Sequence, residues 1–159
     1  MLGHDAVAQA LVDHGVDTMF AVLGDGNLFI GENLVREHGV NLVGATHEAN
    51  AVCMAEGWAK ATGRLGVASV THGPGLTNAM TALVEGTKNR TPMLVVAGDT
   101  PIDNEQHLQN LDQHALVTAS GAGFQAIRNV ESIAEDVSTA VRRALSEHRP
   151  IVINVPLNI

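Results

Sequence analysis

The chain has 159 residues, of which 45% are apolar and 16% are charged, and its formal net charge is −8 at pH 7. This length is typical of one domain with a sizeable core. Lysine and arginine do not cluster and the acidic excess is spread out, so we expect neither a nucleic acid nor an anionic membrane as partner. We therefore predict a single domain over residues 1–159.

Cysteine usage and the N-terminus bear on the compartment. Cys53 is the only cysteine and cannot form a disulfide within the chain, which indicates a reducing compartment. Its neighbours Ala51, Val52 and Met54 predict a thiol packed in the core. The N-terminus lacks a basic segment followed by an apolar one, and no apolar run approaches about 18 residues. The sequence thus predicts a soluble, cytoplasmic protein.

Two helices and one strand are predicted in the first forty residues. Apolar residues recur at helical spacing over residues 5–14, and Gly15 ends this helix. Residues 18–23 form an apolar run typical of a buried strand, which ends in the turn at 24–27. A second helix is predicted over residues 28–37.

The middle of the chain continues the alternation. Residues 41–45 are a predicted strand, and residues 48–62 a helix that Gly63 ends. A strand over residues 66–71 leads to a helix over 74–88, whose early proline suits the first helical turn.

The last third opens with the clearest strand, an uninterrupted apolar run over residues 93–98. The polar stretch over residues 103–113 is predicted to be a long loop. The remaining predicted elements are a short helix over 114–119, a strand over 124–127, a helix over 132–148 and a strand over 151–155.

Strands that are continuous apolar runs thus alternate with helices along the chain. This is typical of a parallel sheet covered by helices on both sides. The predicted fold class is α/β, a three-layer sandwich with an open parallel sheet of about six strands. Because the sequence stops directly after a strand, we expect either a domain cut from a longer protein or one subunit of a split protein.

Two segments place polar and small residues at the carboxyl ends of predicted strands, where open parallel sheets bind ligands. Glu48 begins an almost wholly apolar helix, and Gly73-Pro74-Gly75 follows the strand over 66–71. We expect this acid to be buried, and a buried carboxylic acid facing a small-residue turn suits the binding and protonation of a flat heteroaromatic cofactor. Apolar neighbours favour the protonated acid whereas the helix dipole favours the anion, and the sequence leaves that balance open.

Seven motifs occur in order along almost the whole chain. They are residues 20–24, His47-Glu48-Ala49, and residues 56–63, 73–78, 92–99, 108–112 and 149–156. Together the series resembles the N-terminal pyrimidine-binding domain of thiamine-diphosphate enzymes, the group that includes acetolactate synthase, benzaldehyde lyase and several 2-oxo acid decarboxylases. The chain departs from the family pattern by lacking the proline of the first turn and by carrying His72 for serine, Asp99 for glutamine and Asn110 for an acid. These departures do not change the cofactor that the resemblance implies, but they leave the identity of the substrate undecided.

The resemblance implies that thiamine diphosphate is the cofactor and that this chain binds its pyrimidine end. In the family a glutamic acid donates a hydrogen bond to N1′ of the aminopyrimidine, which favours the imino form that removes the C2 proton. The matching residue is Glu48, our predicted catalytic residue; an ordinary first-turn glutamate is the alternative. The predicted cofactor-binding surface is formed by Gly73, Pro74 and Gly75, with Asn78 orienting the turn or bonding locally.

Four further residues are candidates for contact with the substrate. His72 could carry protons because imidazole titrates near neutrality, and a hydrogen-bonded structural histidine is an equally good interpretation. Gly24, Asp25 and Gln109 are candidate substrate-pocket residues. An ordinary Asp-Gly turn and solvated loop polar groups explain these three without a ligand.

No metal site is predicted on this chain. The sequence Gly24-Asp25-Gly26 with Asn50 imitates the magnesium signature of the family's other cofactor-binding domain, but Asn50 lies inside the predicted Glu48 helix. Asp25 alone supplies too few oxygens for Mg²⁺. The resemblance implies that a separate domain of the same or another subunit binds the diphosphate and Mg²⁺. We expect a homodimer or homotetramer, and no activity from this chain alone.

The resemblance implies a lyase or transferase that acts on small 2-oxo acids or acyloins. Carboligation and decarboxylation share the same carbanion step, so this chain leaves the choice open. The alternatives are a non-catalytic regulatory or scaffold domain that kept the fold, one subunit of a two-subunit 2-oxo acid decarboxylase, and an unrelated flavodoxin-like nucleotide binder. The turn at 24–27 is too short and acidic to favour the nucleotide binder.

Overall fold

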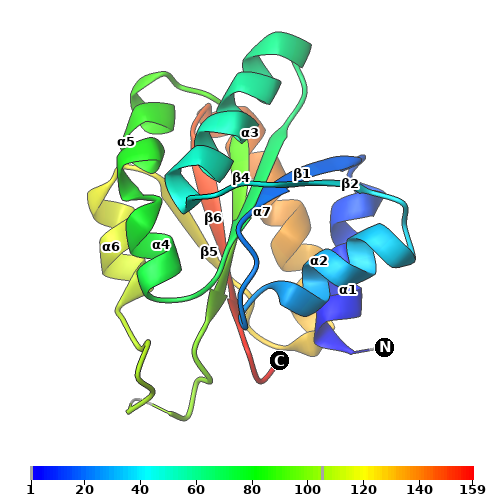
Figure 1. Ribbon diagram of the computed structural model, residues 1–159, viewed down its shortest axis with the longest axis vertical. Helices are drawn as coiled ribbons and strands as arrows, with labels where there is room; N and C mark the ends of the chain where they lie inside the picture. Colours follow the sequence, from blue (N-terminus) through cyan, green and yellow to red (C-terminus); the bar gives the residue numbers. More distant parts are fainter. Residues whose placement is uncertain (1, 105) are drawn as a thin grey trace.

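Six parallel strands form one open sheet in the computed structural model, which describes residues 2–104 and 106–159 (Figure 1). The strands are β1 (Thr18–Ala21), β2 (Asn41–Gly44), β3 (Gly66–Val70), β4 (Met93–Asp99), β5 (Gly123–Ala126) and β6 (Pro150–Pro156). Their order is β2-β1-β3-β4-β6-β5, and all neighbouring pairs are parallel. The predicted fold class and all six predicted strands are confirmed.

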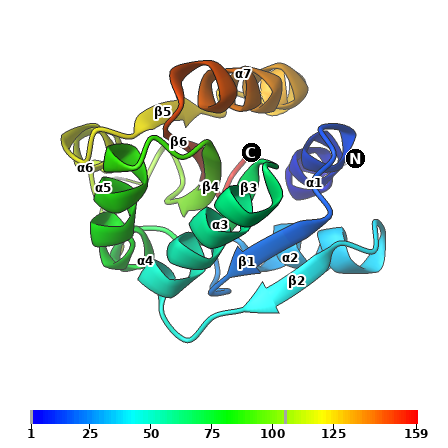
Figure 2. The ribbon, with the colours of Figure 1, turned by 90° about the horizontal axis from the view of Figure 1, so that it is seen from above.

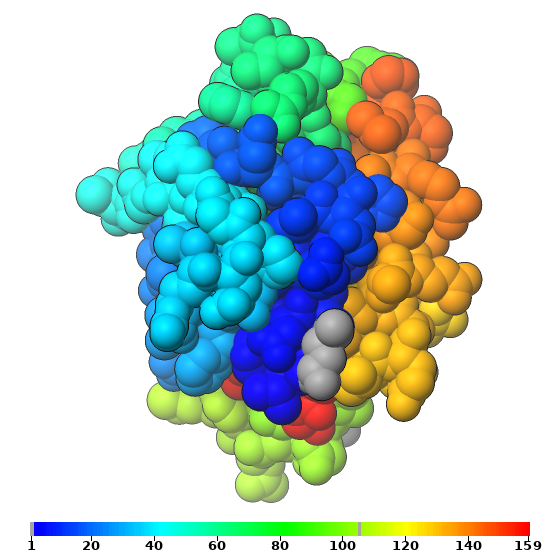
Figure 3. All heavy atoms as spheres, turned by 90° about the vertical axis from the view of Figure 1, so that its right-hand side faces the viewer, coloured from blue at the N-terminus to red at the C-terminus, as the bar shows by residue number. Residues whose placement is uncertain are grey.

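Helices cover both faces of the sheet. They are α1 (Gly3–Asp13), α2 (Leu28–Arg36), α3 (Glu48–Thr62), α4 (Pro74–Asn78), α5 (Met80–Lys88), α6 (Gln113–Ala119) and α7 (Ile133–Glu147). Figure 2 shows α1, α2 and α7 on one side and α3, α4, α5 and α6 on the other. In Figure 3, α1 lies between α2 and α7 in the first of these layers. Among the described residues, no helix has the length and apolar character needed to cross a bilayer.

The sheet separates two apolar cores because neighbouring residues of a strand point to opposite faces. In β4, Leu94 and Val96 belong to the core under α1, α2 and α7. Val95 and Ala97, between and after them, belong to the core under the other four helices. Both sets are fully buried, which accounts for the uninterrupted apolar run in the sequence.

The chain changes direction across the sheet between β1 and β3. After β1 it passes through α2 to the edge strand β2, and after β3 it passes through α4 and α5 to β4 on the opposite side. The carboxyl ends of β1 and β3 therefore border a topological switch point, where open α/β sheets bind ligands. The 24–27 turn, the start of α3 and the 71–75 turn all lie at this edge, as the sequence predicted.

The single helix predicted over residues 74–88 is wrong, because it is interrupted. Residues 74–88 form two helices, α4 and α5, with Ala79 between them. The Ala79 N–H bonds to the Leu76 carbonyl, 3.0 Å away, in place of the residue four positions back. This tighter i→i−3 bond interrupts the α-helical ladder. As a result α4 is a single short turn that carries the Pro74-Gly75 segment.

The predicted burial of Cys53 is also wrong. The thiol belongs to an exposed residue of α3, whereas its neighbours Ala51 and Val52 are fully buried. Its helical position turns it away from the sheet despite the apolar flanks. Partial burial and the negative charges of Glu56 and Glu85 raise the pKa of this thiol, so it is not an activated nucleophile.

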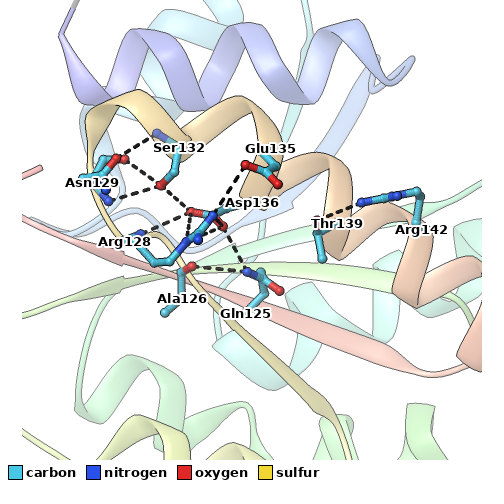
Figure 4. Close-up of polar contacts among 9 residues, drawn as sticks. All are labelled: Gln125, Ala126, Arg128, Asn129, Ser132, Glu135, Asp136, Thr139 and Arg142. Atoms are coloured by element: carbon cyan, nitrogen blue, oxygen red, sulfur yellow. Dashed lines mark hydrogen bonds and ion pairs between the residues drawn. The ribbon is translucent and has the colours of Figure 1, made fainter.

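A buried carboxylate fixes the start of α7 (Figure 4). A single 3-10 turn, Val130–Ser132, precedes the helix, so α7 begins one residue later than predicted. Asp136 accepts hydrogen bonds from Ser132 Oγ at 2.6 Å, from Arg128 Nε at 3.0 Å and from the Arg128 N–H at 3.2 Å. Burial raises the pKa of Asp136, but these bonds and the Arg128 charge outweigh it and hold the pKa below its usual value.

Candidate functional site at the carboxyl edge of the sheet

Glu48 is the first residue of α3, where the backbone leaves the edge strand β2. His47 is the N-cap, and its Nδ1 accepts a hydrogen bond from the Ala49 N–H at 3.2 Å. The Glu48 side chain is half-buried and extends to α4, where its Oε2 accepts a hydrogen bond from Asn78 Nδ2 at 3.0 Å. Two segments thirty residues apart in sequence are thereby joined through one carboxylate.

The glycine turn after β3 lies directly against this carboxylate. A Cβ atom added to Gly75 would lie 3.7 Å from Glu48 Oε1, which places the acid over a residue without a side chain. In the described part of the chain, no hydrogen bond reaches Glu48 Oε1. The structure thus brings together Glu48, Gly75 and Asn78, three of the predicted cofactor residues, and leaves one carboxylate oxygen available.

Both glycines are also required by contacts within the chain. Gly73 has φ +59° and ψ −112°, and a Cβ there would collide with the Gln109 carbonyl oxygen. A Cβ on Gly75 would lie 2.7 Å from Thr71 Cγ2. Internal packing therefore suffices to explain the two glycines, and their role in approaching a ligand remains a prediction. Pro74 is exposed at the first position of α4, where its missing N–H costs no helical bond.

His72 lies inside the protein, with 1% of its surface exposed. Its Nε2 is 2.7 Å from Gln109 Oε1, an acceptor, so Nε2 carries the proton. With Nδ1 then unprotonated, the Thr71 hydroxyl, which lies 3.3 Å away and accepts the Gly26 N–H at 3.0 Å, can donate to it. This directed chain fits the structural interpretation of His72, and the proton-carrier role stays a prediction.

The turn after β1, residues 24–27, packs against Thr71 and His72. Asn27 is almost fully buried; its Oδ1 accepts the Gly24 N–H at 2.8 Å and its Nδ2 donates to Ser69 Oγ at 2.9 Å. Asp25 is exposed beside this turn and borders a small cavity of about 60 Å³. Asn27 was not among the predicted residues. Its signal in the sequence was an amide at the end of a Gly-x-Gly turn, where side chains commonly bond to the local backbone.

Gln113 is the second residue that the sequence did not reveal. The 103–113 stretch was predicted to be a loop, and Gln113 is instead the first residue of α6, after Asp112 as N-cap. Its side chain is 3% exposed and accepts the Gly73 N–H at 2.8 Å. A lone glutamine in a polar stretch carries no sequence signal that separates it from its solvated neighbours.

Glu48 is half-buried and Asn78 is exposed, so the site faces the surface of this chain. A cavity of about 400 Å³ lies at the opposite, amino-terminal edge, between residues such as Asp17, Trp58, Arg64 and Leu145, and none of the predicted cofactor residues lines it. Among the described residues, no three His, Cys, Asp or Glu side chains come together as a metal site would require. At the carboxyl edge, the Glu48 acid, the Asn78 amide and the Gly75 backbone lie together.

The sequence was compared with models of known families. Residues 1–116 match the model described as the thiamine pyrophosphate enzyme, N-terminal TPP binding domain. The chain belongs to this family. The resemblance drawn from the motifs is therefore confirmed, and thiamine pyrophosphate (thiamine diphosphate) is the family's cofactor.

Curated relatives of this thiamine pyrophosphate enzyme domain are larger proteins. A probable acetolactate synthase of Mycobacterium bovis is 36% identical over 88% of this chain and 26% of its own length. A sulfoacetaldehyde acetyltransferase of Rhodobacter capsulatus is 31% identical over 98% of this chain and 27% of its own. The 2-hydroxyacyl-CoA lyase 2 of Mus musculus is 32% identical over 99% of this chain and 25% of its own length. The chain thus spans about a quarter of the length of these relatives.

The residues at the carboxyl edge fit the pyrimidine end of this cofactor. An aminopyrimidine needs a hydrogen-bond donor for a ring nitrogen and a backbone surface for its face. A protonated Glu48 could supply the first through its available Oε1, and the backbone beside Gly75 could supply the second; both roles remain predictions.

Proposed function

We propose that this chain is the pyrimidine-binding half of a thiamine-diphosphate-dependent lyase or transferase that acts on 2-oxo acids or acyloins. The observation that carries the proposal is the position of Glu48. Its carboxylate spans from α3 to α4, bonds to Asn78 at 3.0 Å and lies against Gly75, at the switch point of the sheet.

In this proposal the Glu48 carboxyl group is protonated on Oε1 and donates a hydrogen bond from there to N1′ of the aminopyrimidine. Asn78 keeps Oε2 engaged, which orients the carboxyl group and leaves Oε1 directed at the ring. The Gly73-Pro74-Gly75 backbone forms the wall on which the ring lies. When bound, thiamine diphosphate supplies an acidic C2–H whose loss yields a nucleophile for carbonyl carbons.

Substrate contacts come from the neighbouring turn and loop in this proposal. Gln109, Gly24 and Asp25 contact the substrate, and His72 either transfers a proton or holds Gln109 in place through their 2.7 Å contact. The relatives act on different substrates according to their names, which include an acetolactate synthase and a 2-hydroxyacyl-CoA lyase. The choice between carboligation and decarboxylation therefore lies in these variable contacts and in the partner domain.

We further propose that the diphosphate and Mg²⁺ are bound by a separate domain, of the same or another subunit, within a homodimer or homotetramer. The support is that, among the described residues, no three His, Cys, Asp or Glu side chains come together, whereas Mg²⁺ requires several oxygens, usually including those of phosphates. The partial exposure of Glu48 is consistent with a site completed by another surface.

The test is C2 proton exchange of thiamine diphosphate with Mg²⁺ and a diphosphate-binding partner domain, measured by NMR in deuterated water. We expect Glu48→Gln to slow exchange by about 10²- to 10⁴-fold, the usual contribution of a positioned acid or base. Glu37→Gln, an exposed acid after α2, is the matched control and should leave the rate unchanged. Equal rates for wild type and Glu48→Gln would remove Glu48 from the mechanism, and no exchange in the wild type would favour a scaffold domain.

A further inference from the structure

One buried amide connects the glycine turn to two other strands. Gln113 Oε1 accepts the Gly73 N–H at 2.8 Å. Gln113 Nε2 donates to the Gly98 carbonyl at 2.9 Å and to Asn154 Oδ1 at 2.6 Å. Both amide hydrogens and the carbonyl of this side chain are therefore in use, and 3% of the residue is exposed.

The network continues to the ends of β4 and β6. Asn154 Nδ2 donates to Asp99 Oδ2 at 2.7 Å, and Asp99 Oδ1 accepts the Thr100 N–H at 2.8 Å. Gly98 and Asp99 end β4, and Asn154 lies in β6. The turn that follows β3 is thus fixed to β4 and β6 through a side chain from α6.

The Gly73 N–H has no alternative partner of its own element. Gly73 is the N-cap of α4, has no side chain and takes a left-handed φ of +59°. The first N–H groups of a helix lack intrahelical acceptors, and a buried N–H without a partner is costly. Gln113 supplies that acceptor, so its side chain sets where the Gly73 backbone lies.

We propose that Gln113 is a positioning residue, which holds the Gly73-Pro74-Gly75 backbone at a fixed place relative to Glu48. The inference rests on the proposed function, in which this backbone is the wall for the pyrimidine ring. Gln113 itself touches no reacting atom; it acts through the Gly73 amide. Small misplacements of a binding surface have large effects on rate and affinity, which is why such a support matters.

Three variants of the chain separate positioning from general stability. Gln113→Leu removes every polar contact of the side chain. Gln113→Glu keeps an oxygen for the Gly73 N–H and loses the donors to Gly98 and Asn154. Val117→Ala is the control, because Val117 is fully buried in the same helix and belongs to the apolar core, away from the Gly73 hydrogen bond.

The first measurement is amide hydrogen exchange at Gly73 by NMR, which needs no cofactor. We expect Gln113→Leu to accelerate exchange at Gly73 by about tenfold or more relative to the Leu83 amide of α5, the effect of one lost hydrogen bond. In Gln113→Glu the Gly73 amide should stay closer to the wild type. Val117→Ala should change both amides alike. Faster exchange at Gly73 in Val117→Ala equal to that in Gln113→Leu would overturn the proposal.

The second measurement is the apparent affinity for thiamine diphosphate, together with kcat, in the complex with a diphosphate-binding partner. Gln113→Leu should weaken that affinity by about tenfold more than Val117→Ala does. An equal loss in both variants would show that Gln113 is merely structural. The proposed function fails separately, namely when Glu48→Gln leaves the C2 proton exchange of thiamine diphosphate unchanged. In that case amide hydrogen exchange at Gly73 still decides whether Gln113 holds the turn.

Discussion

Glu48 and Asp136 are both carboxylates in the first turn of a fifteen-residue helix, α3 and α7 respectively, yet their surroundings are opposite. Asp136 is 2% exposed and is surrounded by donors from Arg128, Ser132 and Gln125 (Figure 4). Glu48 is half-buried, and its described partner is one neutral amide, that of Asn78. Both carboxylate oxygens of Asp136 accept hydrogen bonds, whereas Glu48 Oε1 accepts none from the described residues.

The difference separates a structural acid from a candidate catalytic one. Asp136 closes the connection between β5 and α7, and each of its lone pairs serves the chain itself. A group that must bind a ligand needs unused hydrogen-bonding capacity and a route to its surface. Glu48 has both. The four predictions below test this contrast, beginning with the largest expected effect on stability.

Removing the Asp136 carboxylate should cause the largest loss of stability. In Asp136→Ala the Ser132 hydroxyl and the Arg128 N–H lose their partner, and we expect a loss of about 3 kcal/mol. For a chain of this size that corresponds to a Tm lower by about 6–12 °C. Urea and thermal unfolding followed by circular dichroism measure both quantities. Glu135→Ala is the control, because the Glu135 side chain is exposed and its ion pair with Arg128 is long, at 3.7 Å. A similar loss of stability in Glu135→Ala would contradict the prediction.

The contribution of Asp136 should also depend on pH. Because its pKa is lower in the folded chain than in the unfolded one, its stabilisation is complete above the ordinary aspartate pKa and is lost as the pH falls through the folded value. The difference in unfolding free energy between wild type and Asp136→Asn should therefore be largest near pH 7 and shrink below about pH 4. Urea titrations across this range, with Asp13→Asn as an exposed control, provide the measurement. A difference that is constant down to pH 3 would refute the assignment.

Most of the fold could be predicted from the sequence because the strands are uninterrupted apolar runs, and burial on both faces is the condition that such runs report. The break at Ala79 could not be predicted, since it depends on one i→i−3 hydrogen bond that leaves no mark in composition. Cys53 was misplaced because apolar neighbours in sequence lie on different faces of a helix.

The candidate site could be predicted in part. The topology of a parallel sheet brings the residues after β1, β2 and β3 to one edge, so Glu48 and Gly75 were expected to meet, and they do. Gln113 and Asn27 could not be recognised, because each acts through long-range hydrogen bonds that sequence spacing does not encode. The two interpretations of His72 were left equal for the same reason: its partner Gln109 lies 37 positions away.

Glu56 tests an intermediate case within α3 itself. It is 6% exposed, and its Oε1 accepts hydrogen bonds from Lys60 at 2.7 Å, Asn89 at 2.8 Å and Thr91 at 3.1 Å. Glu56→Gln keeps an oxygen for the last two and loses the charge opposite Lys60, whose side chain is half exposed. We expect a loss of about 1 kcal/mol in urea unfolding. A loss as large as that of Asp136→Ala would mean that the ion pair, and not the buried network, stabilises this helix.

The smallest effect on stability should come from Glu48, the residue that we propose has the largest effect on chemistry. In Glu48→Gln the side-chain carbonyl can still accept the Asn78 hydrogen bond, and no buried donor is left without a partner. The unfolding free energy should therefore change by less than about 0.5 kcal/mol, as at an ordinary surface position, and Asn78→Ala should behave alike. Urea unfolding of both variants beside Asp136→Ala measures the contrast directly. Because a catalytic acid contributes its free energy to a ligand and not to the fold, destabilisation of Glu48→Gln by several kcal/mol would reclassify Glu48 as a structural acid of the same kind as Asp136.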